Sequence, residues 1–172
     1  MTLLHLVAQA RIASPLGPIT LAATARGLAG LWFDGQKHHP GTLDAPQDES
    51  QAFIAMARAE LQRYWQGGGT GGAHGRFELP LDAQGTPFQR AVWQALREIP
   101  AGRTSTYAAV AARAGAPAAV RAVGAAIGRN PLSIIVPCHR VLGRDGSLTG
   151  YAGGLQRKQA LLQLEAAAAH AG

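Results

Sequence analysis

Cysteine is almost missing from this sequence: Cys138 is the only one among 172 residues. A single cysteine cannot form a disulfide within the chain, so the cytoplasm is the expected location. The same scarcity argues against a zinc site, because one cysteine and scattered histidines offer no ligand spacing. We therefore expect neither a bound metal nor another cofactor.

Long hydrophobic runs are also missing. No apolar stretch approaches the roughly 20 residues that a membrane span needs. The first residues, MTLLHLVAQARIAS, lack the basic start, long apolar centre and cleavage site that together make a signal peptide. Hydrophobic residues still make up 47% of the chain, which is enough for a packed core and argues against global disorder.

Acidic residues are scarce in the second half of the chain. Residues 1–86 carry six Lys or Arg and seven Asp or Glu, whereas residues 87–172 carry ten and three. The second half therefore has a net charge of +7 and would attract a polyanion such as nucleic acid. A solvated surface with an arginine bias gives the same charge, so basicity alone does not decide between the two interpretations.

The first half predicts strands followed by a helix. Residues 10–35 hold short apolar stretches separated by turn signals, which favours an antiparallel meander. Residues 50–69 place Phe53, Ala57, Leu61 and Trp65 at helical spacing, with glycine ready to end the helix. The glycine-rich residues 67–75 predict a flexible join. FELPLD, residues 77–82, predicts a short extended piece.

The second half predicts helices. Thr86, Pro87 and Gln89 form a capping box before a helix whose expected buried stripe is Phe88, Val92, Ala95, Leu96 and Ile99. Two short helices follow, over residues 105–115 and 116–131, joined through a glycine-containing turn. This arrangement suggests a helix-turn-helix, although structural helical hairpins use the same parts. The final helix is expected over residues 154–170.

The second of the two short helices, AAVRAVGAAIGRN, is unusual for a helix that reads bases. Small residues dominate it, and it lacks the serine or threonine that would contact base edges. One face must pack inside the domain. On the other face, Arg121 and Arg129 project from a helix surface that otherwise consists of small residues. This shape suits minor-groove binding with an inserted side chain and little sequence preference.

Cys138 stands at the end of the apolar run IIVP and is followed by His139 and Arg140. A cysteine in such a run is commonly a buried small hydrophobe. Pro137 favours a strand that ends there, and a nearby base or cation favours the thiolate. In a regular strand, His139 would face away from Cys138, so a working pair needs a turn, a tight helical start or a bridging water. Glu165, the only acid of the final helix, is the candidate to orient the imidazole, unless it is a solvated surface residue.

NPLSIIVPCHRV, followed by GYAGGLQRK, resembles the active-site signature of the O6-alkylguanine-DNA alkyltransferases, the methylated-DNA–protein-cysteine methyltransferases. GTPFQRAVWQALREIPAGRTSTYAAVA resembles the lead-in helix and first helix of that family's helix-turn-helix. VRAVGAAIGRNP resembles its recognition helix. The resemblance covers residues 85–165 nearly without a gap, and the first half is similar only loosely.

The resemblance implies a fold and an activity. The fold is α+β: a ribonuclease-H-like α/β domain over residues 1–84, then a mostly helical, winged-helix-like domain over residues 85–172. The activity is irreversible transfer of a methyl or other alkyl group from O6-alkylguanine, and also from O4-alkylthymine, to the protein's own cysteine. The implied partner is double-stranded DNA with alkylated bases, whose lesion is flipped out after minor-groove binding. A monomer without an obligate protein partner is expected.

The resemblance also implies roles for residues. Cys138 is the nucleophile, His139 the base acting through a water, and Glu165 the group that orients it. Asn130 ties the recognition helix to the active-site turn, Tyr107 stands by the DNA backbone and can donate a proton to the departing base, and Lys158 assists at the pocket. The remaining residues are expected in DNA binding (Arg121, Ala119, Ala122 and Arg129, with Tyr107) and in the substrate pocket (Tyr151, Gly153, Val136 and Pro137).

One departure from the family concerns the loop after Tyr151. Some members have a bulky Arg-Trp pair there, whereas this chain has Ala152 and Gly153. The smaller residues imply a more open pocket lip that tolerates larger alkyl groups. Two functions from other classes remain as alternatives: a helix-turn-helix regulator with a structural cysteine, and a thiol hydrolase with a Cys138–His139 dyad.

Overall fold

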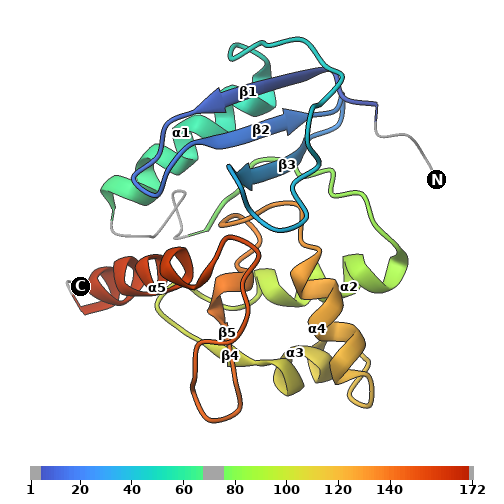
Figure 1. Ribbon diagram of the computed structural model, residues 1–172, viewed down its shortest axis with the longest axis vertical. Helices are drawn as coiled ribbons and strands as arrows, with labels where there is room; N and C mark the ends of the chain where they lie inside the picture. Colours follow the sequence, from blue (N-terminus) through green and yellow to red (C-terminus); the bar gives the residue numbers. More distant parts are fainter. Residues whose placement is uncertain (1–4, 68–75, 171–172) are drawn as a thin grey trace.

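The computed structural model describes residues 5–67 and 76–170 (Figure 1). A three-stranded sheet and one helix form the N-terminal part, and four helices with two very short strands form the C-terminal part. This α+β layout confirms the fold class expected from the sequence. The join predicted over residues 67–75 lies, apart from Gly67, outside the described residues.

The N-terminal sheet is an antiparallel meander in the order β1-β2-β3, as predicted. Its strands are β1 (Ala8–Ile12), β2 (Ile19–Ala23) and β3 (Leu28–Phe33). The turn between β1 and β2 contains Gly17 at φ +105°, a conformation that glycine adopts without steric cost. Every residue of β3 is buried, because β3 lies between β2 and the C-terminal part of the chain.

The edge of β3 that does not pair with β2 is covered by two segments, one that follows α1 and one that follows α4. Leu28 exchanges backbone hydrogen bonds with Pro80 and Asp82, in the piece predicted to be extended. Leu31 donates to the carbonyl of Pro131 and accepts from the amide of Ser133. The chain just before Cys138 is therefore fixed directly to the N-terminal sheet.

Helix α1 (Ala52–Gln66) packs on the sheet and ends at Gly67. Gln51 caps its first turn by accepting hydrogen bonds from the amides of Phe53 and Ile54. The helix was predicted correctly, but its buried side is rotated from the predicted stripe. Phe53 and Trp65 are only half-buried, and the fully buried apolar residues are Ile54, Ala57, Leu61 and Tyr64.

Helices α2 (Pro87–Arg97), α3 (Tyr107–Arg113) and α4 (Val120–Gly128) pack together as a helix-turn-helix with its supporting helix. The predicted capping box is present. The backbone amide of Gln89 donates to the Thr86 hydroxyl, and the backbone amide of Thr86 donates to the side-chain oxygen of Gln89. The prediction that Phe88 is buried is wrong. Its ring is 36% exposed, because Phe88 lies in the first turn of α2 before the helix reaches the core.

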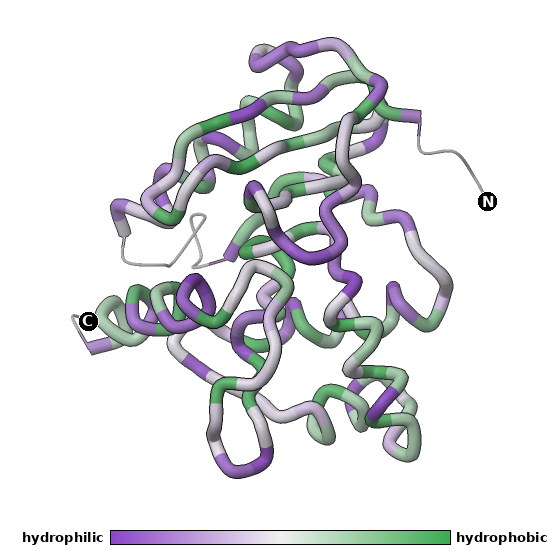
Figure 2. The backbone as a smooth tube through the Cα atoms, viewed as in Figure 1, coloured by the Kyte–Doolittle hydropathy of each residue, from purple (hydrophilic) through white to green (hydrophobic). Residues whose placement is uncertain are grey.

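The remaining elements surround the cysteine. The short strands β4 (Ser105–Thr106) and β5 (Val141–Leu142) pair in parallel, and the 3₁₀ helix η1 (Cys138–Arg140) leads into β5. Helix α5 (Leu155–His170) packs against η1. Along the helices, hydrophobic and hydrophilic residues alternate as in amphipathic elements (Figure 2). Within the described ranges no helix has the length and apolarity to cross a membrane.

Candidate functional site

The chain reaches Cys138 through two tight turns rather than the predicted strand. Ile135 donates to the carbonyl of Ser133 around Ile134, whose φ of +71° is rare for a β-branched residue. Cys138 donates to the carbonyl of Val136 around Pro137, at φ −81° and ψ 63°. These values are those of an inverse γ-turn, which proline accepts because its own amide is not needed. The strand prediction is wrong because only residues 131–133 of this segment pair with β3, and the chain turns away after them.

The thiol of Cys138 lies at the start of η1 and is 5% exposed. The side-chain amide of Asn130 donates to its sulfur at 3.2 Å and to the carbonyl of Val136 at 2.8 Å. The Asn130 carbonyl oxygen accepts from the amide of Leu132. Asn130 follows α4, so one side chain ties the end of the recognition helix to the turn that carries the thiol.

His139 is fully buried and hydrogen-bonded to Glu165. Its Nε2 lies 2.7 Å from Oε1 of Glu165, which projects from α5. Its Nδ1 is buried without a hydrogen-bond partner among the described residues. Of the alternatives that the sequence left open, the structure has the tight helical start, in the form of η1.

Glu165 is held by two residues whose contact with it was not predicted from the sequence. Arg140 donates to both of its carboxylate oxygens, at 2.9 and 2.8 Å, and also to the carbonyl of Ile99. The hydroxyl of Tyr64, on α1, donates to Oε1 at 2.9 Å. Arg140 stands next to the Cys-His pair in the sequence, and this adjacency is the signal that could have identified it. Tyr64 is 101 positions away from Glu165, and no local pattern links the two residues.

Burial and these hydrogen bonds set the protonation states. Burial raises the pKa of Glu165, but the bonds from His139 and Arg140 outweigh it and bring the pKa to about 2. Burial lowers the pKa of His139 despite the neighbouring carboxylate. At neutral pH the imidazole is therefore uncharged; with Nε2–H donating to Glu165, Nδ1 is left as a proton acceptor. Burial also raises the pKa of Cys138, a rise that the Asn130 amide and the charge of Lys158 oppose.

Lys158, also on α5, is completely buried, and no carboxylate within residues 5–67 and 76–170 pairs with it. Its ammonium donates to the carbonyls of Val141 and Thr149, at 2.6 and 2.9 Å, and closes the base of the loop between β5 and α5. Burial lowers the pKa of Lys158, and the charge of Cys138 would raise it. The lysine therefore holds this loop and places positive charge near the thiol.

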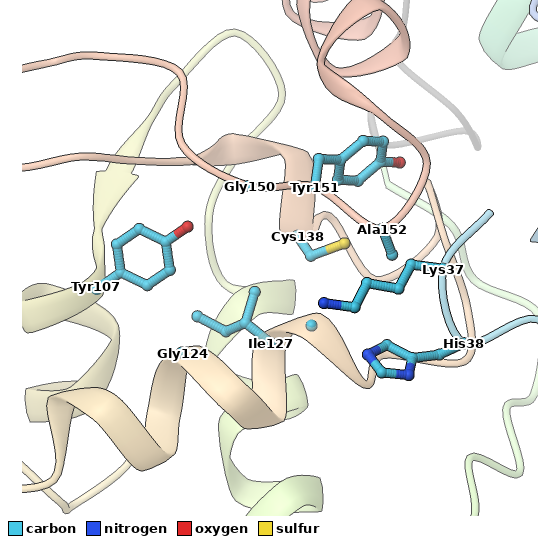
Figure 3. A pocket seen from close by; sticks show the side chains of 10 residues that line it. Lys37, His38, Tyr107, Gly124, Ile127, Cys138, Gly150, Tyr151 and Ala152 are labelled. Carbon is cyan, nitrogen blue, oxygen red and sulfur yellow. The ribbon is translucent and has the colours of Figure 1, made fainter.

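Cys138 lies on the wall of a cavity of about 270 Å³ (Figure 3). Tyr107 and the small residues Gly124 and Gly128 form the helix-turn-helix side of this cavity. The hydroxyl of Tyr107 is 2.9 Å from that of Thr149, so the first residue of α3 touches the opposite loop. The other lining residues come from the loops and α4: Lys37, His38, Ile127, Gly150, Tyr151 and Ala152.

Three of the four predicted pocket residues do not line this cavity. Val136 turns away from it and lines a different hollow beside α2. Pro137 only forms the turn behind Cys138, and Gly153 packs against the rings of Tyr151 and Phe33, where a Cβ would come within 2.7 Å of Tyr151. Only Tyr151 has the predicted place, together with Ala152 beside it.

The outer face of α4 carries the residues predicted to bind DNA. Arg121, Ala122 and Arg129 are exposed, and Ala119, the N-cap residue, is half-buried. The opposite face packs through Val123, Ala126 and Ile127, and Trp93 of α2 donates to the carbonyl of Ala126 at 2.8 Å. The helix thus presents a small-residue surface with two arginines, and its last turn borders the cavity of Cys138.

Fold and site together define a class: two-domain proteins in which a helix-turn-helix unit carries a Cys–His–Glu site beside its second helix. Comparison with known families specifies the class further. The model of the 6-O-methylguanine DNA methyltransferase ribonuclease-like domain matches residues 7–83, and that of the DNA-binding domain matches residues 87–167. The chain belongs to the 6-O-methylguanine DNA methyltransferase family.

Individual relatives match over nearly their whole length. The methylated-DNA–protein-cysteine methyltransferase of Methanosarcina barkeri is 47% identical over 157 residues, which are 90% of this chain and 94% of the relative. That of Haemophilus influenzae is 43% identical over 88% of this chain and 82% of its own. The crystal structure of Mycobacterium tuberculosis OGT in complex with DNA superimposes with a TM-score of 0.82 at 43% identity, covering 94% of each chain.

Proposed function

We propose that this protein repairs alkylated DNA by transferring the alkyl group from O6-alkylguanine to Cys138. The observation that carries the proposal is the Cys138 thiol on the wall of an open cavity, beside a buried His139–Glu165 pair. The curated relatives named above are methylated-DNA–protein-cysteine methyltransferases, and one solved relative is bound to DNA. We place the domain boundary between residues 84 and 85, in the gap between the two family matches.

The proposed chemistry begins with a proton leaving the thiol. His139 accepts it at Nδ1 through a bridging water, and Glu165 stabilises the imidazolium that forms. The thiolate attacks the alkyl carbon, so that a carbon–sulfur bond forms as the bond to O6 breaks. The released guanine takes a proton, for which the Tyr107 hydroxyl at the cavity wall is the proposed donor. Asn130 and Lys158 hold the thiol turn and the loop around it.

DNA recognition is proposed to occur through α4. A base inside a duplex cannot reach a recessed thiol, so the damaged nucleotide must be flipped out. Arg121 is exposed on the helix and is proposed to fill the space that the base leaves, while Ala119, Ala122 and Arg129 contact the minor groove. Binding by shape and backbone charge suits lesions that occur in any sequence.

Two features of the chain favour a broad substrate range and a single turnover. Ala152, which follows Tyr151, places only a small side chain at the lip of the cavity, which suits larger alkyl groups and O4-alkylthymine. Alkylation of Cys138 forms a stable thioether, and the chain has no second cysteine that could take the alkyl group from it. Each molecule is therefore proposed to act once. We also propose that it acts as a monomer in the cytoplasm.

The proposal is tested with duplex DNA that carries radiolabelled O6-methylguanine. The wild-type protein is expected to take up the label, whereas Cys138→Ser is expected to bind the DNA and take up none. Label on the Cys138→Ser protein would refute the assignment of the acceptor. Binding without transfer by the wild type would favour a helix-turn-helix regulator, and repeated turnover would favour a thiol hydrolase.

A further inference from the structure

Two residues of the N-terminal domain, Lys37 and His38, lie on the wall of the Cys138 cavity. They belong to the connection between β3 and α1, far in sequence from every residue predicted for the site. Figure 3 shows the Lys37 side chain extending into the space beside the cysteine sulfur, with the His38 ring next to it. Both residues are exposed, so a molecule that approaches the cavity can reach them.

The loop that carries them is fastened to both segments that frame the thiol. The backbone amide of Lys37 donates to the carbonyl of Ala152 at 2.8 Å, in the loop between β5 and α5. The buried side chain of Gln36 accepts from the Ser133 hydroxyl, in the segment before Cys138, and from the amide of Phe33. The loop therefore has a defined position at the site, although it belongs to the other domain.

The backbone of His38 supports a functional role for this position. Its φ of +60° lies in the left-handed region, which residues other than glycine adopt uncommonly. Such conformations persist where the surrounding structure enforces them, and they cluster at binding sites. Here the conformation presents the imidazole to the cavity.

Charge at the mouth of the cavity is of one sign. In the part of the chain that the structure describes, no aspartate or glutamate lines it. Partial burial and the charges of Arg129 and Lys37 together lower the pKa of the His38 imidazole. Arg129, at the end of α4, is therefore close to His38. Basic groups from both domains therefore meet where a flipped nucleotide would enter, and its phosphate is the anion that arrives there.

We propose that Lys37 and His38 bind a DNA backbone phosphate next to the flipped nucleotide, so that the N-terminal domain contributes directly to substrate binding. This inference rests on the proposed function, because it assumes that the ligand is DNA. Lys37 supplies the ion pair, His38 a hydrogen bond, and Arg129 faces the same phosphate from the recognition helix.

The test compares Lys37→Gln, the double variant Lys37→Gln/His38→Ala, and Arg63→Gln as a control. Arg63 lies on the exposed side of α1 in the same domain and away from the cavity, so its variant removes an equal charge. Binding of a fluorescent duplex that contains O6-methylguanine is measured in a Cys138→Ser background, from about 50 to about 300 mM salt. Alkylation of Cys138 by the free base O6-benzylguanine, which has no phosphate, is measured in the otherwise unchanged protein.

We expect Lys37→Gln to weaken duplex binding about fivefold at low salt and to reduce the slope of log K against log salt by about 0.9. The double variant should bind still more weakly, Arg63→Gln should match the parent protein, and alkylation by the free base should fall much less than duplex binding does. An unchanged salt slope in Lys37→Gln would overturn the proposal. A parallel loss with the free base would instead assign the two residues to the base and also overturn it. If the wild type is alkylated by neither substrate, the proposed function fails, while the salt slope still decides whether Lys37 contacts a phosphate.

Discussion

At the scale of single residues, the buried carboxylate of Glu165 organises the site. It accepts hydrogen bonds from His139, Arg140 and Tyr64, and it is only 1% exposed. A buried charge is tolerated only when its partners replace the lost water. Glu165 therefore has two effects that can be separated: it balances the charge of Arg140, and it orients the proposed base.

Replacing Glu165 by Gln tests both effects. The substitution leaves Arg140 buried without its counter-charge, so the free energy of unfolding should fall by about 3 kcal/mol. Alkyl transfer should slow by about a hundredfold, because the imidazolium loses its stabilising charge. Chemical denaturation and single-turnover kinetics measure the two losses. Glu98→Gln is the matched control, since Glu98 pairs with Arg113 only at the surface, and a similar effect there would contradict the special role of Glu165.

The pH dependence of stability follows from the same pair. Glu165 has a pKa of about 2 in the fold, below its unfolded value near 4.3, so its contribution is present above that value and is lost as the pH falls toward 2. Burial lowers the pKa of His139, so only the unfolded chain gains this proton as the pH falls below about 6.5. Both effects predict a free energy of unfolding that declines steadily from pH 7 to acid. Urea denaturation at several pH values measures it, and a constant stability down to pH 4 would contradict the buried neutral imidazole.

Much of the site could be predicted at this scale, because its signals are local. Because neighbours in a strand face opposite sides, the sequence Pro-Cys-His already predicted that a working pair needs a turn, a tight helical start or a bridging water. The role of Glu165 was open from the sequence alone, because a lone acid on a helix is more often solvated. The positions of Lys37 and His38 had no local signal, since only the docking of one domain on the other brings them to the thiol.

At the scale of elements, the predictions succeeded where periodicity and caps are strong. The meander, α1, the capping box of α2 and the two helices of the helix-turn-helix were predicted by such patterns. The run IIV before Cys138 predicted a strand, because β-branched residues favour that conformation. Its true conformation includes Ile134 at φ +71°, which depends on the packing of β3 against residues 131–133 and cannot be inferred from the sequence.

Helix α1 is predicted to influence the site through Tyr64. Tyr64→Phe keeps the buried ring and removes only the hydroxyl that donates to Glu165. The free energy of unfolding should fall by about 1 kcal/mol. Without this hydrogen bond the carboxylate of Glu165 attracts protons more strongly and stabilises the His139 imidazolium better. The imidazole should then become protonated at a higher pH, so the pH below which transfer slows should rise. Denaturation and the pH profile of single-turnover transfer measure these changes. Lower stability with an unchanged pH profile would show that Tyr64 stabilises the fold without influencing His139.

At the scale of the whole molecule, the two domains meet at the edge of β3, and both supply residues to the cavity of Cys138. The free edge of β3 holds the chain before Cys138, and the loop after β3 reaches the cavity with Lys37 and His38. The excess of positive charge lies in the second half of the sequence, but the cavity mouth combines basic groups from both halves. The N-terminal domain thus positions the reactive segment and lines part of the cavity around its thiol.

The most direct test of the account identifies where the alkyl group goes and how many are transferred. The protein is incubated with a large excess of duplex DNA containing O6-methylguanine. The masses of the intact protein and of its peptides are then measured by mass spectrometry. We predict the gain of one methylene mass per molecule, confined to the peptide with Cys138, and no further gain on longer incubation. A methyl group on another residue, or several lesions repaired per molecule, would contradict the assignment of Cys138 as a single-use acceptor.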